Sequence, residues 1–250
     1  MKKSLILKNN NHFKEFEING FFIIRNFFDK QLLKNCLDEI YLIKKADKYY
    51  EKNGKLRRIE RIYDKGKNLK KINNSLIKFL NKTFNKKFVI FKDKLNAKPP
   101  GGKGFFAHYD GIFYFKNKNN ILKRGWYEYS DFFINSLIAF DKCTEKNGTI
   151  EISKNNYKDS FFNLIKNTYK DGTPRILKKI EKKINFQKII LGKGDVLFFS
   201  NTCPHRSKQN KTKRSRKTLY YTYATQKNNN IYNRYFLDKL QSQNKTSKSL

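Results

Sequence analysis

The chain has 250 residues, with 38% hydrophobic and 16% aromatic side chains, and this apolar content excludes an intrinsically disordered protein. Single β-barrels and sandwiches often reach this length without splitting, so we expect one folded domain over residues 1–240. The 56 Lys+Arg against 21 Asp+Glu give a formal net charge of +35, which would attract nucleic acid, an anionic membrane or an anionic substrate.

The first expected elements are a strand and a helix. A strand is predicted over residues 21–24 (FFII), because this β-rich run follows the turn signal Asn19-Gly20. A helix is predicted over about 30–45, where apolar residues recur every three or four positions. Asp29 precedes this pattern and can cap the N-terminus of the helix.

A second helical pattern runs from Leu69 to Leu80. Between the two helices lies a polar stretch over residues 56–60 (LRRIE), to which no element is assigned. The N-terminal part of the domain, about 28–82, is therefore predicted to be mainly helical.

From residue 86 onward the sequence changes to short apolar runs, which are separated by Gly, Pro and Asn. The runs cover residues 88–91, 112–115, 134–140, 149–152, 189–191, 196–199 and 219–223. Many short strands with turn signals between them predict a jelly roll, or double-stranded β-helix, as the core over about 86–225. The fold class is thus mainly β with flanking N-terminal helices. Residues 153–183 are polar and predict an excursion with a short helix, and residues 241–250 predict a disordered tail.

The positive charge has a second explanation besides a charged partner. An AT-rich genome favours Lys, Asn, Ile and Phe, and all four are abundant here while Ala is scarce. The basic residues are scattered, and no zinc-finger spacing, basic zipper or RNA-binding aromatic motif accompanies them. We therefore expect no specific nucleic-acid partner.

Cysteine usage and the N-terminal sequence bear on location. The three cysteines, Cys36, Cys143 and Cys203, lie far apart, and their number is odd. This disfavours a disulfide framework or a CxxC metal site and is consistent with a reducing cytoplasm. The apolar run near the N-terminus spans three residues, too few for a signal-peptide core or a membrane span. We expect a cytoplasmic protein without a membrane span, as a monomer or homodimer.

Two of the three histidines stand in contexts that invite metal chemistry. Residues two apart on a strand point to the same face, so His108 and Asp110 can bind one ion together. His205 follows a predicted strand and can complete the set from a neighbouring strand. Two neutral imidazoles and one carboxylate form the facial triad that holds Fe(II). The pattern His-x-Asp alone is common by chance, and structural or surface histidines are the alternative.

The sequence around these residues carries further motifs. Residues 94–102 (KLNAKPPGG) end in a Gly-rich bend, which leads directly into 105–110 (FFAHYD). Later, 194–199 (GDVLFF) precedes 204–207 (PHRS), and Arg216 follows the histidine of that motif by eleven positions. In these motifs the sequence resembles the phytanoyl-CoA dioxygenase family of Fe(II)/2-oxoglutarate oxygenases. The resemblance extends over nearly the whole chain.

The resemblance implies an iron site and a reaction type. His108, Asp110 and His205 match the iron ligands of the family. Related halogenases have a small residue in place of the carboxylate, so Asp110 favours hydroxylation over halogenation. The implied activity is that of a dioxygenase that uses Fe(II), 2-oxoglutarate and O₂ to hydroxylate a C–H bond, with ascorbate as a supporting reductant.

The resemblance also implies a cosubstrate site. Arg216 matches the arginine that binds the distal carboxylate of 2-oxoglutarate, a task that suits the planar guanidinium. Ser207 matches the hydroxyl that shares this carboxylate. Trp126, the only tryptophan, lies eighteen residues after His108 and matches a tryptophan beside the cosubstrate. Asn96 matches an amide near the same pocket.

Each of these cosubstrate residues has an alternative interpretation. Arg216 lies in the basic run Lys213–Lys217, which suits a solvated turn, and Arg214 competes with it for the functional role. Trp126 also suits the core, and Asn96 also suits a turn or a strand. Asn147-Gly148 resembles a turn between two strands of the family and is expected to be structural.

The substrate is open at the level of sequence. Residues 56–61 and 232–239 are most similar to bacterial members resembling organophosphonate hydroxylases, which act on small anions such as 2-aminoethylphosphonate. Tailoring of a natural product, lipid or surface sugar is the alternative within catalysis. A jelly-roll binding protein and a basic nucleic-acid-binding module are the alternatives outside it. The chain departs from the family at residues 153–156 (SKNN), where many members have Gly-Ser-His.

Overall fold

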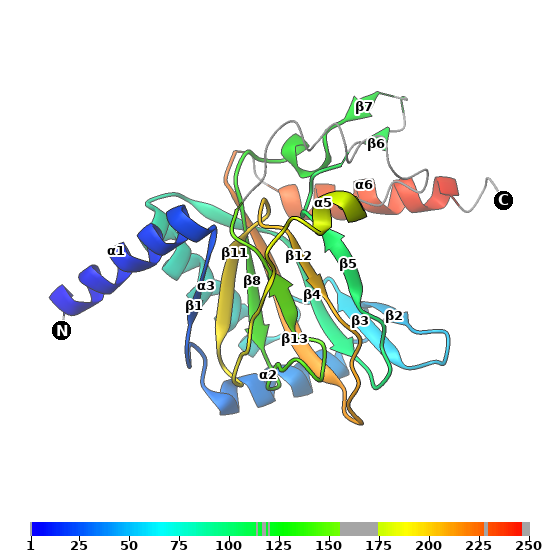
Figure 1. The fold of residues 1–250 in the computed structure, drawn as a ribbon, viewed down its shortest axis with the longest axis horizontal. Coiled ribbons are helices and arrows are strands. Elements are labelled where there is room, and N and C mark those ends of the chain that lie inside the picture. Colours follow the sequence, from blue (N-terminus) through cyan, green and yellow to red (C-terminus); the bar gives the residue numbers. More distant parts are fainter. Residues whose placement is uncertain are drawn as a thin grey trace.

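The computed structural model describes residues 2–113, 115–116, 119, 121–155, 175–227 and 230–246. The helices are α1 (Lys2–Asn19), α2 (Lys30–Leu42), α3 (Lys67–Phe84), α5 (Lys178–Glu181) and α6 (Ile231–Thr246), with a 3₁₀ turn η1 (Gly125–Glu128). The strands are β1 (Phe21–Ile24), β2 (Asp47–Tyr50), β3 (Leu56–Glu60), β4 (Phe88–Lys98), β5 (Phe105–His108), β6 (Phe115–Lys116), β7 (Leu122–Lys123), β8 (Phe133–Ala139), β9 (Ile150–Ile152), β10 (Gln187–Lys188), β11 (Val196–Ser200), β12 (His205–Ser207) and β13 (Arg216–Thr225). Figure 1 shows how these elements are arranged.

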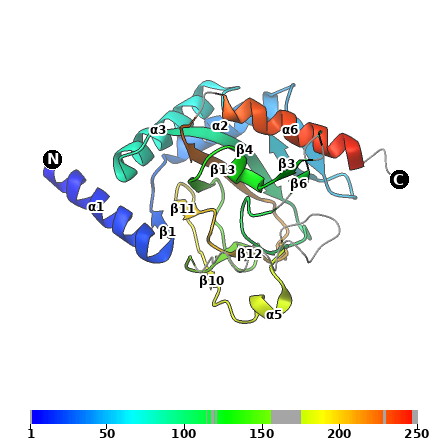
Figure 2. The same cartoon turned by 90° about the horizontal axis from the view of Figure 1, so that it is seen from above.

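The strands form two main sheets. The major sheet has seven strands in the order β1-β11-β8-β13-β4-β3-β2, and the minor sheet has four in the order β10-β9-β12-β5. Neighbouring strands in both sheets are antiparallel. Figure 2 shows α2, α3 and α6 on one face of the major sheet, and β10 and β12 of the minor sheet on the other. The fold is therefore mainly β with flanking helices, as the sequence predicts.

Strand β4 shows how alternation divides the side chains between two environments. Over residues 92–98, the odd-numbered residues face the helices: Leu95 is fully buried in the core there, and Asp93 accepts hydrogen bonds from the backbone N–H groups of Ile62 and Tyr63. The even-numbered residues of this part face the space between the sheets, because successive side chains of a strand point to opposite faces. Four of them line a cavity there: Lys92, Lys94, Asn96 and Lys98.

The core lies between the helices and the major sheet. Apolar residues of α2 and α3 pack onto this face, and Phe22 of β1 stacks on Phe198 of β11 with ring centroids 4.9 Å apart. Asp29 caps α2 as expected, since its side chain accepts hydrogen bonds from the backbone N–H groups of Gln31 and Leu32. The predicted strand over 21–24 and both predicted helices are confirmed, with α2 ending at Leu42.

The expected helices over 28–82 are present as α2 and α3, but β2 and β3 also lie in this segment. The polar stretch 56–60 is strand β3, which pairs with both β2 and β4. The sequence does not show the alternation of a half-buried strand here, because two consecutive residues, Arg57 and Arg58, are charged. Both are accommodated in a partly buried strand because they form ion pairs with Glu51 and Glu60. Helix α1, which covers residues 2–19, was likewise not expected from the sequence.

Two further expectations, a turn at residues 147–148 and a C-terminal tail, differ in outcome. The predicted turn at Asn147-Gly148 is present, and Gly148 adopts a φ of 70°, a conformation that favours glycine. The disordered tail expected over 241–250 is corrected, because α6 continues to Thr246, while 247–250 lie outside the described residues. Gln241, Gln243 and Lys245 are good helix formers, which favours the extension of α6 past residue 240.

The polar excursion expected over 153–183 can be assessed only in part. Helix α5 lies within it, as the expected short helix, while residues 156–174 lie outside the described part of the chain. Among the described helices, none is both long and apolar enough to cross a bilayer.

Candidate metal and cosubstrate site

Three side chains converge from two neighbouring strands, β5 and β12, and from the bend that follows β5. His108 ends β5 and His205 begins β12, and the two are direct partners in the antiparallel register. Nε2 of His108 lies 3.8 Å from Oδ1 of Asp110, and Nε2 of His205 lies 3.7 Å from Oδ2. One ligand atom from each residue lies within 4.8 Å of the others. The structure thus brings together the three residues that the sequence suggests as metal ligands.

The orientation of both imidazole rings is fixed by the backbone. Nδ1 of His108 lies 2.9 Å from the carbonyl oxygen of Phe106, and Nδ1 of His205 lies 3.0 Å from that of Cys203. A carbonyl oxygen can only accept, so each Nδ1 carries the proton and donates it. The neutral tautomer then leaves the Nε2 lone pairs directed toward Asp110, as in a metal site whose ligands are oriented by outer hydrogen bonds.

The carboxylate is oriented by an amide. Asn135 on β8 donates from Nδ2 to Oδ2 of Asp110 at 2.9 Å, and Thr222 donates to Oδ1 of Asn135 at 2.7 Å. The backbone carbonyl of Asp110 also accepts from Nδ2 of Asn201 at 3.2 Å. This chain fixes which way the carboxylate faces before any ion is present. Sequence reasoning missed Asn135, because an asparagine within an apolar run carries no motif of its own.

The electrostatics of the site favour the protonation state that binds a metal. Burial, together with the neighbouring His205 ring, lowers the pKa of His108 to about 3, and burial lowers the pKa of His205 as well. Burial alone would raise the pKa of the Asp110 carboxyl, but both histidines and Lys92 outweigh it and hold that pKa below its usual range. At neutral pH the site therefore holds two neutral imidazoles and one carboxylate.

Arg216 lies at the other end of the same cavity. It begins β13 opposite Lys98 of β4, and it is only 4% exposed. Its Nε is buried without a hydrogen-bond partner, and over the described residues the guanidinium forms no ion pair with Asp or Glu. A buried donor without an acceptor is costly, which points to a ligand group that the cavity accepts. Arg214, the competing residue, is exposed.

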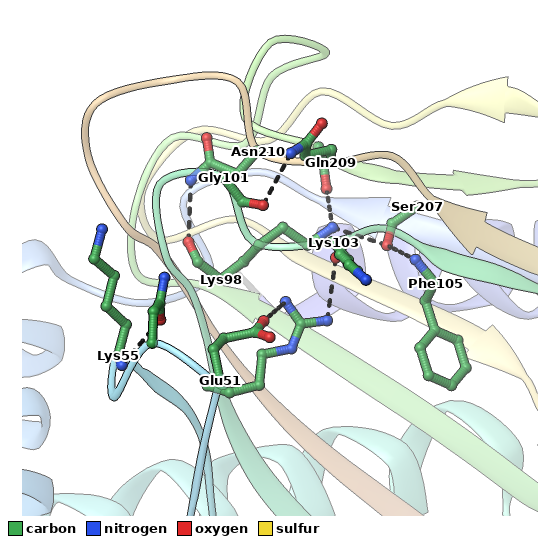
Figure 3. A network of polar contacts seen from close by, with 12 residues as sticks. Glu51, Lys55, Lys98, Gly101, Lys103, Phe105, Ser207, Gln209 and Asn210 are labelled. Carbon is green, nitrogen blue, oxygen red and sulfur yellow. Dashed lines mark hydrogen bonds and ion pairs between the residues drawn. The ribbon is translucent and has the colours of Figure 1, made fainter.

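Ser207 is positioned by a buried lysine. Nζ of Lys98 donates to Oγ of Ser207 at 2.9 Å, and the backbone N–H of Phe105 donates to the same oxygen at 3.3 Å (Figure 3). Lys98 also donates to the carbonyl oxygens of Gly148 and Lys208, at 3.1 and 2.6 Å. A hydroxyl has two acceptor lone pairs and one proton, so Ser207 is left to donate its proton to a ligand.

Trp126 and Asn96 both line the cavity. Trp126 is 3% exposed and packs against Phe91 and Phe133, so it belongs to the core as well as to the cavity wall. Nζ of Lys92 lies 4.0 Å from its ring centroid. Lys98 is the register partner of Arg216, and Lys92 lies six residues before Lys98 on β4, a distance of about 20 Å along the strand. Trp126 therefore lies toward the metal end of the cavity.

The backbone beside Trp126 requires glycine. Gly111 has a φ of 73°, and a Cβ atom there would overlap the indole ring. The residue that follows Asp110 is thus constrained by close packing, which holds the loop after the two ligands against η1.

The cavity of about 300 Å³ is strongly cationic. Among its described lining residues, seven are Lys or Arg and Asp110 is the single carboxylate: the cations are Arg57, Arg58, Lys92, Lys94, Lys98, Arg206 and Arg216. Sequence reasoning missed the lysines of β4. The alternation Lys-x-Lys-x-Asn-x-Lys over 92–98 indicates that four polar side chains share one face of a strand, but it does not indicate that this face lines a cavity.

A family model described as phytanoyl-CoA dioxygenase (PhyH) matches residues 16–218. The chain belongs to the phytanoyl-CoA dioxygenase family. The match includes the three candidate ligands, Ser207 and Arg216. The resemblance stated from the sequence motifs is therefore confirmed.

Two curated relatives have names that give a phosphonate as the substrate. A methylphosphonate hydroxylase of Gimesia maris is 29% identical over 154 residues, which cover 62% of this chain and 52% of that protein. A 2-aminoethylphosphonate dioxygenase of the uncultured bacterium HF130_AEPn_1 is 25% identical over 221 residues, which cover 82% of this chain and 77% of that protein. The matched segment spans about half the length of the methylphosphonate hydroxylase.

Two solved structures share the fold of this chain. The α-ketoglutarate-dependent epimerase SnoN from nogalamycin biosynthesis has a TM-score of 0.65 at 11% identity, covering 88% of this chain and 84% of that one. EctD from S. alaskensis, solved with 2-oxoglutarate and 5-hydroxyectoine, has a TM-score of 0.64 at 14% identity, covering 86% of this chain and 75% of that one. The expected double-stranded β-helix fold is confirmed.

Proposed function

We propose that the protein is an Fe(II)- and 2-oxoglutarate-dependent dioxygenase that hydroxylates a C–H bond of a small anionic molecule, with an organophosphonate such as 2-aminoethylphosphonate as the leading candidate. One observation carries the proposal: a single cavity contains three oriented metal-ligand side chains and, beyond them, a buried arginine whose Nε has no acceptor.

The donor set fits Fe(II). Imidazole nitrogens together with one carboxylate on one face are the ligands of non-haem Fe(II) oxygenases, which leave open positions for cosubstrate and O₂. His108 and His205 would bind through Nε2, since their Nδ1 atoms are used by backbone carbonyls. Asp110 would bind through its carboxylate while Asn135 holds its orientation. When bound, Fe(II) with 2-oxoglutarate supplies the activation of O₂ for C–H hydroxylation.

The residues around Arg216 fit the distal carboxylate of 2-oxoglutarate. The unpaired Nε of Arg216 and the hydroxyl proton of Ser207 are two donors for carboxylate oxygens. Lys98 uses its hydrogen bonds on protein acceptors, so it contributes positive charge and the orientation of Ser207. The role that the sequence suggests for Arg216 and Ser207 is thereby supported by burial and by hydrogen bonding.

The substrate class rests on charge and on the relatives. Two curated relatives are named for phosphonates, and the cavity of this chain carries far more positive than negative groups. A cationic, water-poor cleft concentrates anions. The three cysteines are free and buried, which supports action in a reducing cytoplasm, where ascorbate can serve as a supporting reductant.

The test is product formation. Purified protein with Fe(II), 2-oxoglutarate, ascorbate and O₂ is incubated with a panel of phosphonates, carboxylates and neutral compounds, and succinate is measured against a substrate-free control. Succinate release that a phosphonate stimulates, and that Asp110→Ala abolishes, supports the proposal. Metal-loaded protein that forms no succinate above background with any compound would contradict it.

A further inference from the structure

The cations of the cavity fall into two groups by their partners. Three arginines have glutamate partners: Arg57 with Glu51, Arg58 with Glu60, and Arg206 with Glu151 and Glu181. The other four cations form no ion pair with a carboxylate anywhere in the described ranges: they are Lys92, Lys94, Lys98 and Arg216.

The four unpaired cations divide again by position. Lys98 and Arg216 are register partners across β4 and β13, and they form the end of the cavity proposed for 2-oxoglutarate. Lys92 and Lys94 lie farther along β4, opposite Thr222 and Tyr220. Both line the same cavity as Asp110, and their charges help to lower the pKa of its carboxyl. The two pairs therefore mark two ends of one cavity, with the candidate ligands near the second.

The surroundings of Lys92 and Lys94 do not compensate their charges. Nζ of Lys92 lies 4.0 Å from the Trp126 ring centroid, and Nζ of Lys94 lies 5.0 Å from that of Tyr220. These ring faces attract a cation only weakly compared with a carboxylate. Asp110 is the one carboxylate among the described lining residues, and its charge is required by the metal. Two half-buried ammonium groups without an anion are costly to the fold, which is a signature of a binding site.

We propose that Lys92 and Lys94 form the subsite for a dianionic tetrahedral headgroup of the substrate, a phosphonate or a phosphate ester. This inference rests on the proposed function. A tetrahedral dianion offers three oxygens and up to two negative charges, which match two ammonium groups. A monocarboxylate would leave one ammonium uncompensated. The cavity separates this subsite from the Arg216 end, so substrate and cosubstrate each have their own anion-binding pair.

The experiment measures headgroup binding apart from turnover. Anaerobic protein loaded with Fe(II) and 2-oxoglutarate is titrated calorimetrically with methylphosphonate, methyl phosphate and acetate. The variants are Lys92→Met and Lys94→Met, which keep the length of the side chain and remove its charge. Lys34→Met, on the exposed face of α2, is the matched control.

The expected result has three parts. Wild type and Lys34→Met bind at least one of the two tetrahedral anions more tightly than acetate, and the tighter of the two identifies the headgroup as phosphonate or phosphate ester. Each cavity variant raises the Kd for that anion by about tenfold or more, as expected for a charge-assisted hydrogen bond. The Kd for 2-oxoglutarate, read from the visible charge-transfer band of the chelate, changes less than about twofold, since a neutral cavity variant leaves Arg216 in place.

A stability measurement separates binding from a structural role. Removal of a half-buried, uncompensated charge does not lower the thermal midpoint of the metal-free variants. A lowered midpoint with a parallel loss of 2-oxoglutarate binding would overturn the inference in favour of a structural role. Unchanged anion affinity in both variants, or wild type that binds acetate as tightly as either tetrahedral anion, would also overturn it. Absence of the chelate band in wild type, seen before any substrate is added, would overturn the proposed function itself.

Discussion

Nζ of Lys98 on β4 donates a hydrogen bond to Oγ of Ser207 on β12 at 2.9 Å and thereby links the major sheet to the minor sheet. This contact joins two of the three strands, β4, β12 and β13, that form the end of the cavity proposed for 2-oxoglutarate. It also occupies a lone pair of the hydroxyl, so that the proton of Ser207 is available to a ligand. Lys98 is on this account a positioning residue.

We expect Lys98→Met to raise the KM for 2-oxoglutarate by about 10-fold to 100-fold, because the variant loses a positive charge near Arg216 and the orientation of Ser207. Initial rates of succinate formation at varied 2-oxoglutarate measure the effect. Lys208→Met is the matched control, since the Lys208 side chain is 58% exposed and only its backbone carbonyl contacts Lys98. Equal KM values in the two variants would contradict the role of Lys98.

Affinity for 2-oxoglutarate should fall as pH rises above neutrality. Burial, followed by the charges of Arg216 and Arg57, lowers the pKa of Lys98 to about 7. Below pH 7 the ammonium is charged and attracts the cosubstrate. Above pH 7 the ligand-free protein loses this proton and must regain it on binding, so the Kd rises by up to about tenfold per pH unit. Anaerobic titrations from pH 6 to 8.5 measure the slope, and Lys98→Met should flatten it. A wild-type Kd that is constant over this range would count against the linkage.

Asn135→Ala should weaken metal binding without removing a ligand. Nδ2 of Asn135 holds Oδ2 of Asp110 at 2.9 Å, and loss of such an outer partner typically costs 10-fold to 100-fold in affinity, about 1–3 kcal/mol. Anaerobic competition with a metal chelator measures the Kd for Fe(II). Thr222→Val, which removes only the partner of Asn135, should have a smaller effect in the same direction. Wild-type affinity in Asn135→Ala would show that Asp110 needs no such support.

Asp93 stabilises the fold on the face of β4 opposite the cavity. Its carboxylate accepts from the backbone N–H groups of Arg61, Ile62 and Tyr63 and from the hydroxyl of Tyr232 on α6. Asp93→Ala leaves buried donors without an acceptor and should lower the free energy of unfolding by roughly 3 kcal/mol or more. Tyr232→Phe removes one hydrogen bond and should cost about 1 kcal/mol. Urea unfolding followed by circular dichroism measures the free energy of unfolding of both variants. A similar loss in Asp93→Ala and Tyr232→Phe would contradict this prediction.

The triad could be proposed from sequence because its signal is local and rare. Histidine occurs three times in the chain, and the spacing of His108 and Asp110 predicts two side chains on one face of a strand, although β5 ends at His108 and Asp110 lies in the bend after it. The third candidate ligand, His205, lies almost a hundred residues away, and the resemblance of the motif around it to the family supplied the link. The structure adds what no local pattern contains, namely the direct register pairing of His205 with His108.

The cationic character of the cavity could not be read from the sequence. With 56 Lys and Arg in the chain, Lys92, Lys94 and Lys98 look like any other basic residues until β4 is placed between β3 and β13. Strand β3 was missed for a related reason. Without knowledge of their glutamate partners, Arg57 and Arg58 are expected to lie in a solvent-exposed loop. In both cases tertiary partners, not local propensity, decide the environment.

The central claim is that His108, Asp110 and His205 hold Fe(II) in a site to which 2-oxoglutarate binds. Its most direct test is anaerobic titration of the Fe(II)-loaded protein with 2-oxoglutarate, followed through the weak visible charge-transfer band of the chelate. The account predicts a saturable band in wild type and its loss in His205→Ala, while a folded control, Lys34→Met, retains it. Absence of the band in folded, metal-loaded wild type, or its persistence in His205→Ala, would contradict the account.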